Sequence, residues 1–164
     1  TEILFIESTN ITKEMENFLT SKVTYFLNID ETTSKSNSPH KASAESSQIY
    51  EGLKNVDISK YENIFKISGR YWLTDEFDFK LFDNESNVFY ESKNNSEAIA
   101  TAFYKVNKDY FDLYQKTLDY CRNSTNMLEM EFKKLFNGKY KNINNLGLVG
   151  NVSVDGFFWD GKSV

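Results

Sequence analysis

The chain has 164 residues, a length that fits a single domain with one hydrophobic core. Hydrophobic residues make up 40% of the sequence and aromatic residues 16%, which excludes an intrinsically disordered segment. The formal net charge is -5 and the lysines are scattered among acidic residues, so we expect no nucleic-acid partner. The sequence has no apolar run of about 20 residues and no signal segment, and its one cysteine cannot form an internal disulfide. We therefore expect a soluble, cytoplasmic protein without a transmembrane segment, from which an upstream portion has been removed because the chain starts at Thr1 on an apolar run.

Residues 2–7 form a short apolar run that is typical of a buried parallel strand. The apolar residues that follow recur at helical spacing and predict a short helix: Ile11, Met15, Phe18 and Leu19. Residues 23–27 are the second predicted strand. A strand, a helix and a strand in this order favour a parallel sheet with helices on its faces.

Residues 30–40 have the composition of a polar surface loop. A helix follows, because small or apolar residues recur there every three or four positions: Ala42, Ser46, Ile49, Leu53 and Val56. Residues 63–68 are the third predicted core strand, and residues 88–90 and 98–106 predict two more.

Asn107 is a suitable cap for the next helix, whose apolar face holds Tyr110, Leu113, Tyr114, Leu118 and Cys121. Another helix is predicted from near Asn126, with these residues packing inward: Met127, Leu128, Phe132, Leu135 and Phe136. The glycine-rich, aromatic tail from residue 144 predicts a strand or loop lying over a site. No repeat and no linker divides the chain, so residues 1–164 are predicted to form one domain.

The run Phe65-Lys66-Ile67-Ser68-Gly69-Arg70-Tyr71-Trp72-Leu73 resembles the KISGRY stretch of a group of bacterial and viral glycosyltransferases related to the nucleotide-diphospho-sugar transferases. Two weaker similarities flank it. Lys41-Ala42-Ser43-Ala44-Glu45 looks like the start of that group's helix, and residues 148–156 look like its closing glycine-rich segment. The resemblance covers residues 40–160.

The resemblance implies an α/β fold of the GT-A type, a Rossmann-like, mostly parallel sheet flanked by helices, here in a minimal or truncated form. In such folds a nucleotide-sugar donor lies across the carboxyl ends of the parallel strands. The implied function is a glycosyltransferase of the hexosyltransferase type that moves a sugar to a hydroxyl of a glycan or polysaccharide. The implied donor pocket lies between the first strand, the helix start at Lys41 and the turn from Ser68 to Tyr71.

The chain departs from the family at the metal site. Most GT-A enzymes carry Asp-x-Asp after the core strand, whereas this sequence has Ser68-Gly69-Arg70 there. The nearest acidic residues, Asp75, Glu76 and Asp78, come later. We therefore assign no metal ligand, and Mn²⁺ or Mg²⁺ is an option rather than a requirement.

Arg70 and Lys66 are the candidates for stabilising the negative charge of a diphosphate leaving group. Gly69 would let the backbone approach the ligand or adopt a positive φ. In the alternative reading Lys66 extends along a strand edge and Arg70 pairs with Asp75. We favour a functional role for Arg70 and weigh the two readings of Lys66 equally.

Ser68 and Tyr71 complete the candidate donor-binding turn, since an aromatic face can stack on a sugar or a base. Lys41 and Glu45 are one helical turn apart. They either form an ion pair with each other or contact the donor separately, with Lys41 binding a phosphate and Glu45 orienting the donor. The two alternatives weigh about equally.

A carboxylate must take the proton from the acceptor hydroxyl in an inverting transfer. Glu129 is the first candidate, although Asn126 and Glu129 also have the spacing of a capping box. Glu131 is the second candidate and Asp155 the third.

A rival function is a noncatalytic GT-A-like module that binds a glycan or a protein. Replacing Arg70 should abolish diphosphate binding by a transferase and leave such a module unaffected. A nucleotidyltransferase is disfavoured because residues 7–10, after the first strand, contain no glycine for a phosphate loop.

Overall fold

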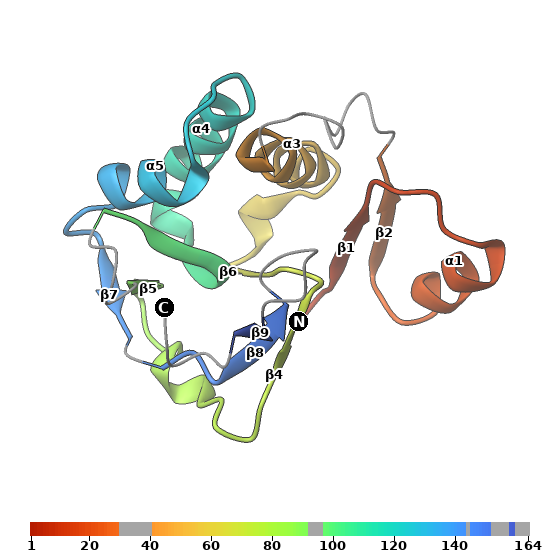
Figure 1. Cartoon of the computed structure of the whole chain (residues 1–164), viewed down its shortest axis with the longest axis horizontal. Helices are drawn as coiled ribbons and strands as arrows, with labels where there is room; N and C mark the ends of the chain where they lie inside the picture. The colour runs from red at the N-terminus through yellow and green to blue at the C-terminus, as the bar shows by residue number, and fades with distance from the viewer. Residues whose placement is uncertain (30–40, 92–96, 144, 152–157, 160–164) are drawn as a thin grey trace. The chain divides into compact units, whose positions relative to one another are not determined.

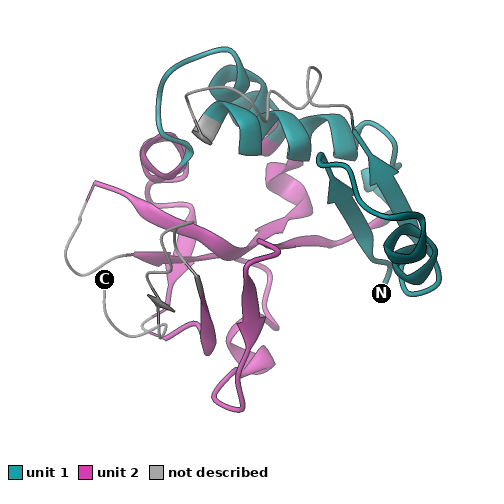
Figure 2. Cartoon of the chain, turned by 45° about the vertical axis from the view of Figure 1, so that its right-hand side comes forward, with its two compact units in different colours: residues 1–60, 115–128 teal, residues 61–114, 129–164 magenta. Residues whose placement is uncertain are grey.

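The computed structural model describes residues 1–29, 41–91, 97–143, 145–151 and 158–159. The chain is a mixed α/β protein that divides into two compact units (Figure 2). Unit 1 comprises residues 1–60 and 115–128, and unit 2 comprises residues 61–114 and 129–164. Each unit is therefore built from two separate stretches of the chain.

Unit 1 begins with the predicted strand, helix and strand (Figure 1). Its elements are β1 (Leu4–Glu7), α1 (Lys13–Thr20), β2 (Tyr25–Asn28), α3 (Lys41–Leu53), the 3-10 turn η1 (Ile58–Lys60) and, from Gln115 onward, α4 (Phe111–Arg122). β1 and β2 pair in parallel, which confirms the predicted parallel pair. All four residues of β1 are half-buried, so the predicted burial of this strand is wrong. α3 lies against β1, because a side chain at Gly52 would meet the end of Ile6.

A helix forms at the predicted place as α1, but it begins at Lys13, so Ile11 lies before it. Its cap is Thr12, whose side chain accepts a hydrogen bond from the Met15 backbone at 3.2 Å. None of its eight residues is buried. Met15 and Phe18 are 48% and 57% exposed, so the periodic apolar face that predicted the helix contributes no core.

Unit 2 contains two sheets. The four-stranded sheet has the order β3-β6-β5-β7, and the three-stranded sheet has the order β4-β8-β9. The strands are β3 (Asn63–Ile67), β4 (Tyr71–Leu73), β5 (Asn87–Glu91), β6 (Ile99–Asn107), β7 (Tyr140–Asn142), β8 (Leu148–Asn151) and β9 (Phe158–Trp159). The helical elements are η2 (Phe79–Leu81), η3 (Lys108–Tyr110), the first part of α4, and α5 (Leu128–Leu135) from Glu129 onward.

The strand predicted at residues 63–68 forms as β3, but its expected place in a mostly parallel sheet is not found. β3 pairs antiparallel with β6, and β5 also pairs antiparallel with β6. Among the described strands only β1–β2 and β5–β7 are parallel. The connection from β5 to β6 is short, and a short connection suits an antiparallel pair because a parallel pair needs a crossover of about a dozen residues or more.

Aromatic rings form the core on both faces of the four-stranded sheet. On one face Phe132 of α5 lies 5.4 Å from Tyr104 and 5.8 Å from Phe89, between ring centres. On the other face Phe103 lies 5.1 Å from Phe82 and 5.5 Å from Phe77. These edge-to-face contacts fix the strands and α5 relative to one another within unit 2.

The two C-terminal helices agree with most of their predicted faces. Asn107 caps η3 by accepting from the Asp109 backbone at 3.1 Å, and Tyr114, Leu118 and Cys121 of α4 are buried. The predicted inward residues Leu128 and Phe132 of α5, and Phe136 directly after it, are fully buried. Met127 is 52% exposed, so its predicted inward position is wrong: it precedes the first turn of the helix.

Candidate functional site

The structure distributes the predicted site residues over both units. Lys41 and Glu45 belong to α3 in unit 1, whereas Glu129 and residues 66–71 belong to unit 2. Asp155 and the side chain of Lys41 lie outside the described part of the chain. The half-buried Glu45 is described, but the expected pairing with Lys41 is not tested.

Three of the predicted residues in unit 2 meet at Thr101 of β6. The Lys66 ammonium donates to the Ser68 hydroxyl at 2.6 Å and to the Thr101 carbonyl at 2.5 Å. The Thr101 hydroxyl donates to Oε1 of Glu129 at 3.1 Å. We call Lys66, Ser68, Thr101 and Glu129 the Thr101 cluster.

The pairing of β3 with β6 explains why the Thr101 cluster assembles. Lys66 stands opposite Tyr104 in the antiparallel ladder, and the Ser68 backbone donates to the Ala102 carbonyl at 2.9 Å. The Lys66 ammonium also lies 5.6 Å from the centre of the Tyr104 ring. Lys66 therefore bends over its neighbouring strand, where hydrogen bonds and a ring face hold its positive charge in place.

Glu129 lies in the first turn of α5, where the helix dipole stabilises a negative charge. The capping-box alternative does not fit the structure. α5 begins at Leu128, so Asn126 stands outside the N-cap position and Glu129 is at the second helical position instead of the third. The Asn126 side chain donates instead to the Tyr120 hydroxyl at 3.0 Å.

The turn between β3 and β4 presents Gly69 and Arg70, both of which are exposed. Only Gly138 and Gly147 have a positive φ among the described glycines, so the positive φ considered for Gly69 is wrong. No described heavy atom lies within 4 Å of the position that a Gly69 side chain would take, so the backbone here is open to approach. The Tyr71 backbone donates to the Ser68 carbonyl at 3.1 Å and closes the turn.

The glycine that allows close packing at this turn is Gly150, on β8. A side chain there would collide with the Arg70 carbonyl and with Tyr71 of the paired strand. The sequence pattern alone gave Gly150 no such role, because the pairing of β4 with β8 joins segments far apart in the chain.

The acidic residues after β4 serve local structure. Asp78 caps η2 by accepting from the Lys80 backbone at 3.0 Å, and Oε2 of Glu76 accepts from the Asn145 side chain at 3.2 Å. Within the described residues, no three or more His, Cys, Asp or Glu side chains are grouped so that they could hold a metal ion.

A second polar network in unit 2 involves residues that the sequence did not single out. Lys133 of α5 lies 2.5 Å from Oε1 of Glu91 and 2.9 Å from the Tyr140 hydroxyl, and that hydroxyl also donates to Glu91. Hydrogen bonds from Lys133 and then from Tyr140 hold the pKa of Glu91 below its usual value. Burial raises the pKa of Tyr140, so its hydroxyl stays protonated. The network ties α5 to β5 and β7.

Lys105 is fully buried in β6 and supports a loop. Its ammonium donates to the Phe82 carbonyl at 2.7 Å and also to the Asn84 carbonyl. Burial lowers the pKa of Lys105, as expected for an ammonium removed from water. Its hydrogen bonds are those of a structural lysine.

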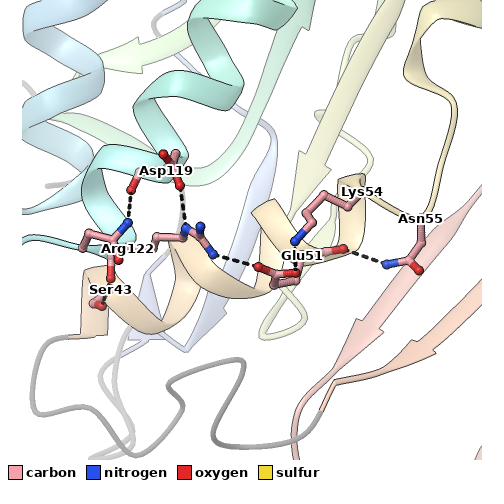
Figure 3. A network of polar contacts seen from close by, with 7 residues as sticks. Ser43, Glu51, Lys54, Asn55, Asp119 and Arg122 are labelled. Atoms are coloured by element: carbon pink, nitrogen blue, oxygen red, sulfur yellow. Dashed lines mark hydrogen bonds and ion pairs between the residues drawn. The ribbon is translucent and has the colours of Figure 1, made fainter.

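In unit 1, Arg122 at the end of α4 joins that helix to α3 (Figure 3). Its guanidinium lies 2.7 Å from Glu51 and 2.7 Å from Asp119, and it stacks over the Tyr50 ring at 4.1 Å. The Ser43 hydroxyl donates to the Arg122 carbonyl at 2.8 Å. This geometry assigns Arg122 to structure.

Within the described residues, no helix is both long and apolar enough to cross a membrane. No protein-family model matches the chain, and searches of curated proteins and of solved structures give no significant match.

Proposed function

We propose that the chain is a glycosyltransferase that moves a sugar from a nucleotide-diphosphate donor to a hydroxyl of a glycan. One observation carries the proposal: a lysine and a carboxylate that the sequence nominated separately belong to one hydrogen-bonded network, the Thr101 cluster. The KISGRY resemblance supplies the reaction class.

In this reaction the acceptor oxygen forms a bond to the anomeric carbon of the donor sugar. The bond from that carbon to the diphosphate oxygen breaks, and its electron pair leaves with the nucleoside diphosphate. Glu129 takes the proton of the acceptor hydroxyl, and the Thr101 hydroxyl orients the Glu129 carboxylate. Lys66 and Arg70 stabilise the charge that grows on the leaving group.

Lys66 suits this task because its charge is held in place before any substrate arrives. Fixed charges stabilise a transition state without reorganising during the reaction. Arg70 adds a planar fork that matches phosphate oxygens, and it follows the open backbone at Gly69.

Taken by itself, unit 1 carries the part of the fold that is nearest to the GT-A type, the parallel pair β1–β2 with α3 against β1. Ligands of open α/β sheets bind at the carboxyl ends of parallel strands. At that end of β1 the Glu7 carboxylate accepts from the backbones of Ser8 and Thr9 at 2.7 and 2.9 Å. The Ser8 hydroxyl accepts from the Gln48 side chain of α3 at 2.5 Å, which fixes the turn after β1.

A thermal-shift screen tests donor binding. The purified chain is heated with UDP, GDP, CDP, dTDP and several UDP-sugars, each with and without Mn²⁺. A ligand at 100 times its dissociation constant should stabilise the folded state by about 2.7 kcal/mol. Arg70→Ala should lose this shift, whereas Lys80→Ala, at an exposed lysine of η2, should keep it.

A second step separates binding from turnover. Glu129→Gln should keep the nucleotide-induced shift but lower the release of nucleoside diphosphate by about 10²- to 10⁴-fold. Thr101→Val should lower it less, since it removes only the orienting hydrogen bond. No shift with any nucleotide, or an unchanged shift in Arg70→Ala, would contradict the transferase.

The second candidate function is a noncatalytic module that binds a glycan or a protein. One observation favours it: the Lys66 ammonium is bonded to Ser68 and Thr101, and these bonds also brace β3 against β6. Under this alternative Lys66→Met should lower the free energy of unfolding. Neither the unchanged chain nor Glu129→Gln should release nucleoside diphosphate, and both should bind the partner equally well.

A further inference from the structure

Unit 2 carries an open pocket of about 350 Å³ that the Thr101 cluster does not use. Its walls include two tyrosines, two lysines, a glutamate and a turn glycine: Tyr110, Tyr140, Lys139, Lys141, Glu85 and Gly138. All of them belong to unit 2. The volume is at the small end of the range for ligand sites, about 300 to 1,000 Å³, and suits one ring-sized group.

Two tyrosines that line the pocket, Tyr110 and Tyr140, are held in place by contacts with other residues of unit 2. The Tyr140 hydroxyl is bonded to Lys133 and Glu91, and its ring meets the Phe89 ring edge-on at 5.3 Å. The Tyr110 ring lies 6.3 Å from the Phe136 ring. These contacts hold two of the lining residues in place before a ligand arrives, which lowers the entropy cost of binding.

The backbone of the pocket is also anchored. The carbonyl of Lys139 accepts a hydrogen bond at 2.7 Å from the fully buried Asn87 side chain. Gly138 has a φ of 71°, which shapes the turn before Lys139. On the other side the Ser86 backbone donates to the Asn84 side chain at 2.9 Å, which orders the segment before β5.

The charged side chains of the pocket are Lys139, Lys141 and Glu85, all exposed. Two cations and one anion leave a net charge of +1, which favours a ligand with a single negative charge. The lining is mostly polar, and its lysine donors and glutamate acceptor together match a ligand that carries hydroxyl groups and one carboxylate.

We propose that this pocket binds an anionic sugar unit, with a carboxylate such as that of a hexuronic acid, and that this unit belongs to the acceptor glycan. Its assignment to the acceptor rests on the proposed transferase function. Glu129, the proposed base, and Lys133, which holds Tyr140, are one turn apart on α5. The same helix therefore carries the proposed base and supports one wall of the pocket.

The test is an NMR titration of the nitrogen-15-labelled chain of 164 residues with glucuronate, with glucose and with acetate at equal ionic strength. Glucuronate should cause saturable shifts of the backbone amides of Ser86, Gly138 and Lys139. Glucose and acetate should cause much smaller shifts, because glucose lacks the carboxylate and acetate lacks the hydroxyl-bearing ring.

Three variants that each remove a charge from the pocket should change the affinity for glucuronate in different directions. Lys141→Gln and Lys139→Gln should each weaken glucuronate binding by about two- to fivefold, as expected for an exposed ion pair. Glu85→Gln should strengthen it by a similar factor, because it removes the opposing charge. Lys80→Gln, which changes an exposed lysine that does not line the pocket, should have no effect.

The proposal is overturned if glucuronate gives no saturable shift at these amides, if acetate or glucose shifts them equally, or if Glu85→Gln weakens binding. Failure of the transferase has a different signature. In that case the nucleotide screen gives no thermal shift while the glucuronate titration still succeeds.

Discussion

Unit 1 and unit 2 hold their helices by different means. In unit 2, α5 packs on the sheet through large rings such as Phe132 and Phe136, both fully buried. In unit 1, the buried positions of α3 are mostly small: Ser43, Ser46, Ser47 and Gly52. Small side chains bury little apolar area, and α3 is joined to α4 by the polar contacts of Arg122 (Figure 3).

This difference has a consequence for function. A close-packed aromatic core holds side chains in defined positions, as a catalytic group requires. The Thr101 cluster and the pocket lined by Tyr110 and Tyr140 are both built from the strands and helices of unit 2. We therefore expect substitutions in the core of unit 2 to affect stability more than substitutions at apolar positions of α1.

The largest expected effect is that of Phe132→Ala. Removing this fully buried ring should lower the free energy of unfolding by about 3 to 5 kcal/mol, through lost burial and a cavity. The matched variant Phe18→Ala removes the same ring from α1, where it is 57% exposed, and should change stability by less than about 0.5 kcal/mol. Urea denaturation followed by circular dichroism measures both. Equal losses would show that Phe18 is buried in solution and would break the contrast between the units.

A second, intermediate effect compares two glycines that each make a close approach. Gly147 of unit 2 has a φ of 58° and faces the backbone of Phe77, so Gly147→Ala should cost about 2 kcal/mol or more. A side chain at Gly52 of unit 1 would come within 2.2 Å of Cδ1 and 2.9 Å of Cγ1 of Ile6, which are side-chain atoms that can move, unlike the backbone of Phe77. Alanine also favours the helix by about 1 kcal/mol, so Gly52→Ala should cost less than Gly147→Ala. The midpoints of thermal unfolding should separate the two variants by several degrees. A large loss in Gly52→Ala would mean that α3 and β1 cannot move apart.

The smallest effect concerns the Glu91 network. Because the pKa of Glu91 is lowered in the folded state, its contribution is fully present above the unfolded value near 4.5 and is lost as the pH falls through the folded pKa. Glu91→Gln should cost about 1 kcal/mol at pH 7 and should flatten the fall of stability between pH 5 and pH 3. Tyr140→Phe removes one of the two donors and should give a smaller change. The measurement is the free energy of unfolding across this pH range. If it falls with decreasing pH as steeply in Glu91→Gln as in the unchanged chain, the network does not contribute to stability as proposed.

Much of the local structure followed from the sequence. The parallel pair β1 and β2, the helix α3, the cap at Asn107 and the inward face of α5 all depend on spacing and capping within short segments. The pairing of β3 was not predicted correctly, because an apolar strand carries no signal for whether its neighbour runs parallel or antiparallel. The exposed face of α1 shows the same limit: periodicity predicts a helix but does not say whether another element covers it.

The candidate site divides in the same way. The sequence by itself determined that Lys66, Ser68 and Arg70 lie in one strand-to-turn segment and that Glu129 opens a helix, since these are neighbours along the chain. Only the tertiary structure decided that Thr101 of β6 is hydrogen-bonded to both Lys66 and Glu129. The same holds for the close packing of Gly150 against the turn at Arg70 and for the hydrogen bonds of the Tyr140 hydroxyl to Lys133 and Glu91. The physical reason is range: spacing and capping act over a few residues, whereas these contacts join strands and helices that meet only when the core of unit 2 closes around its aromatic rings.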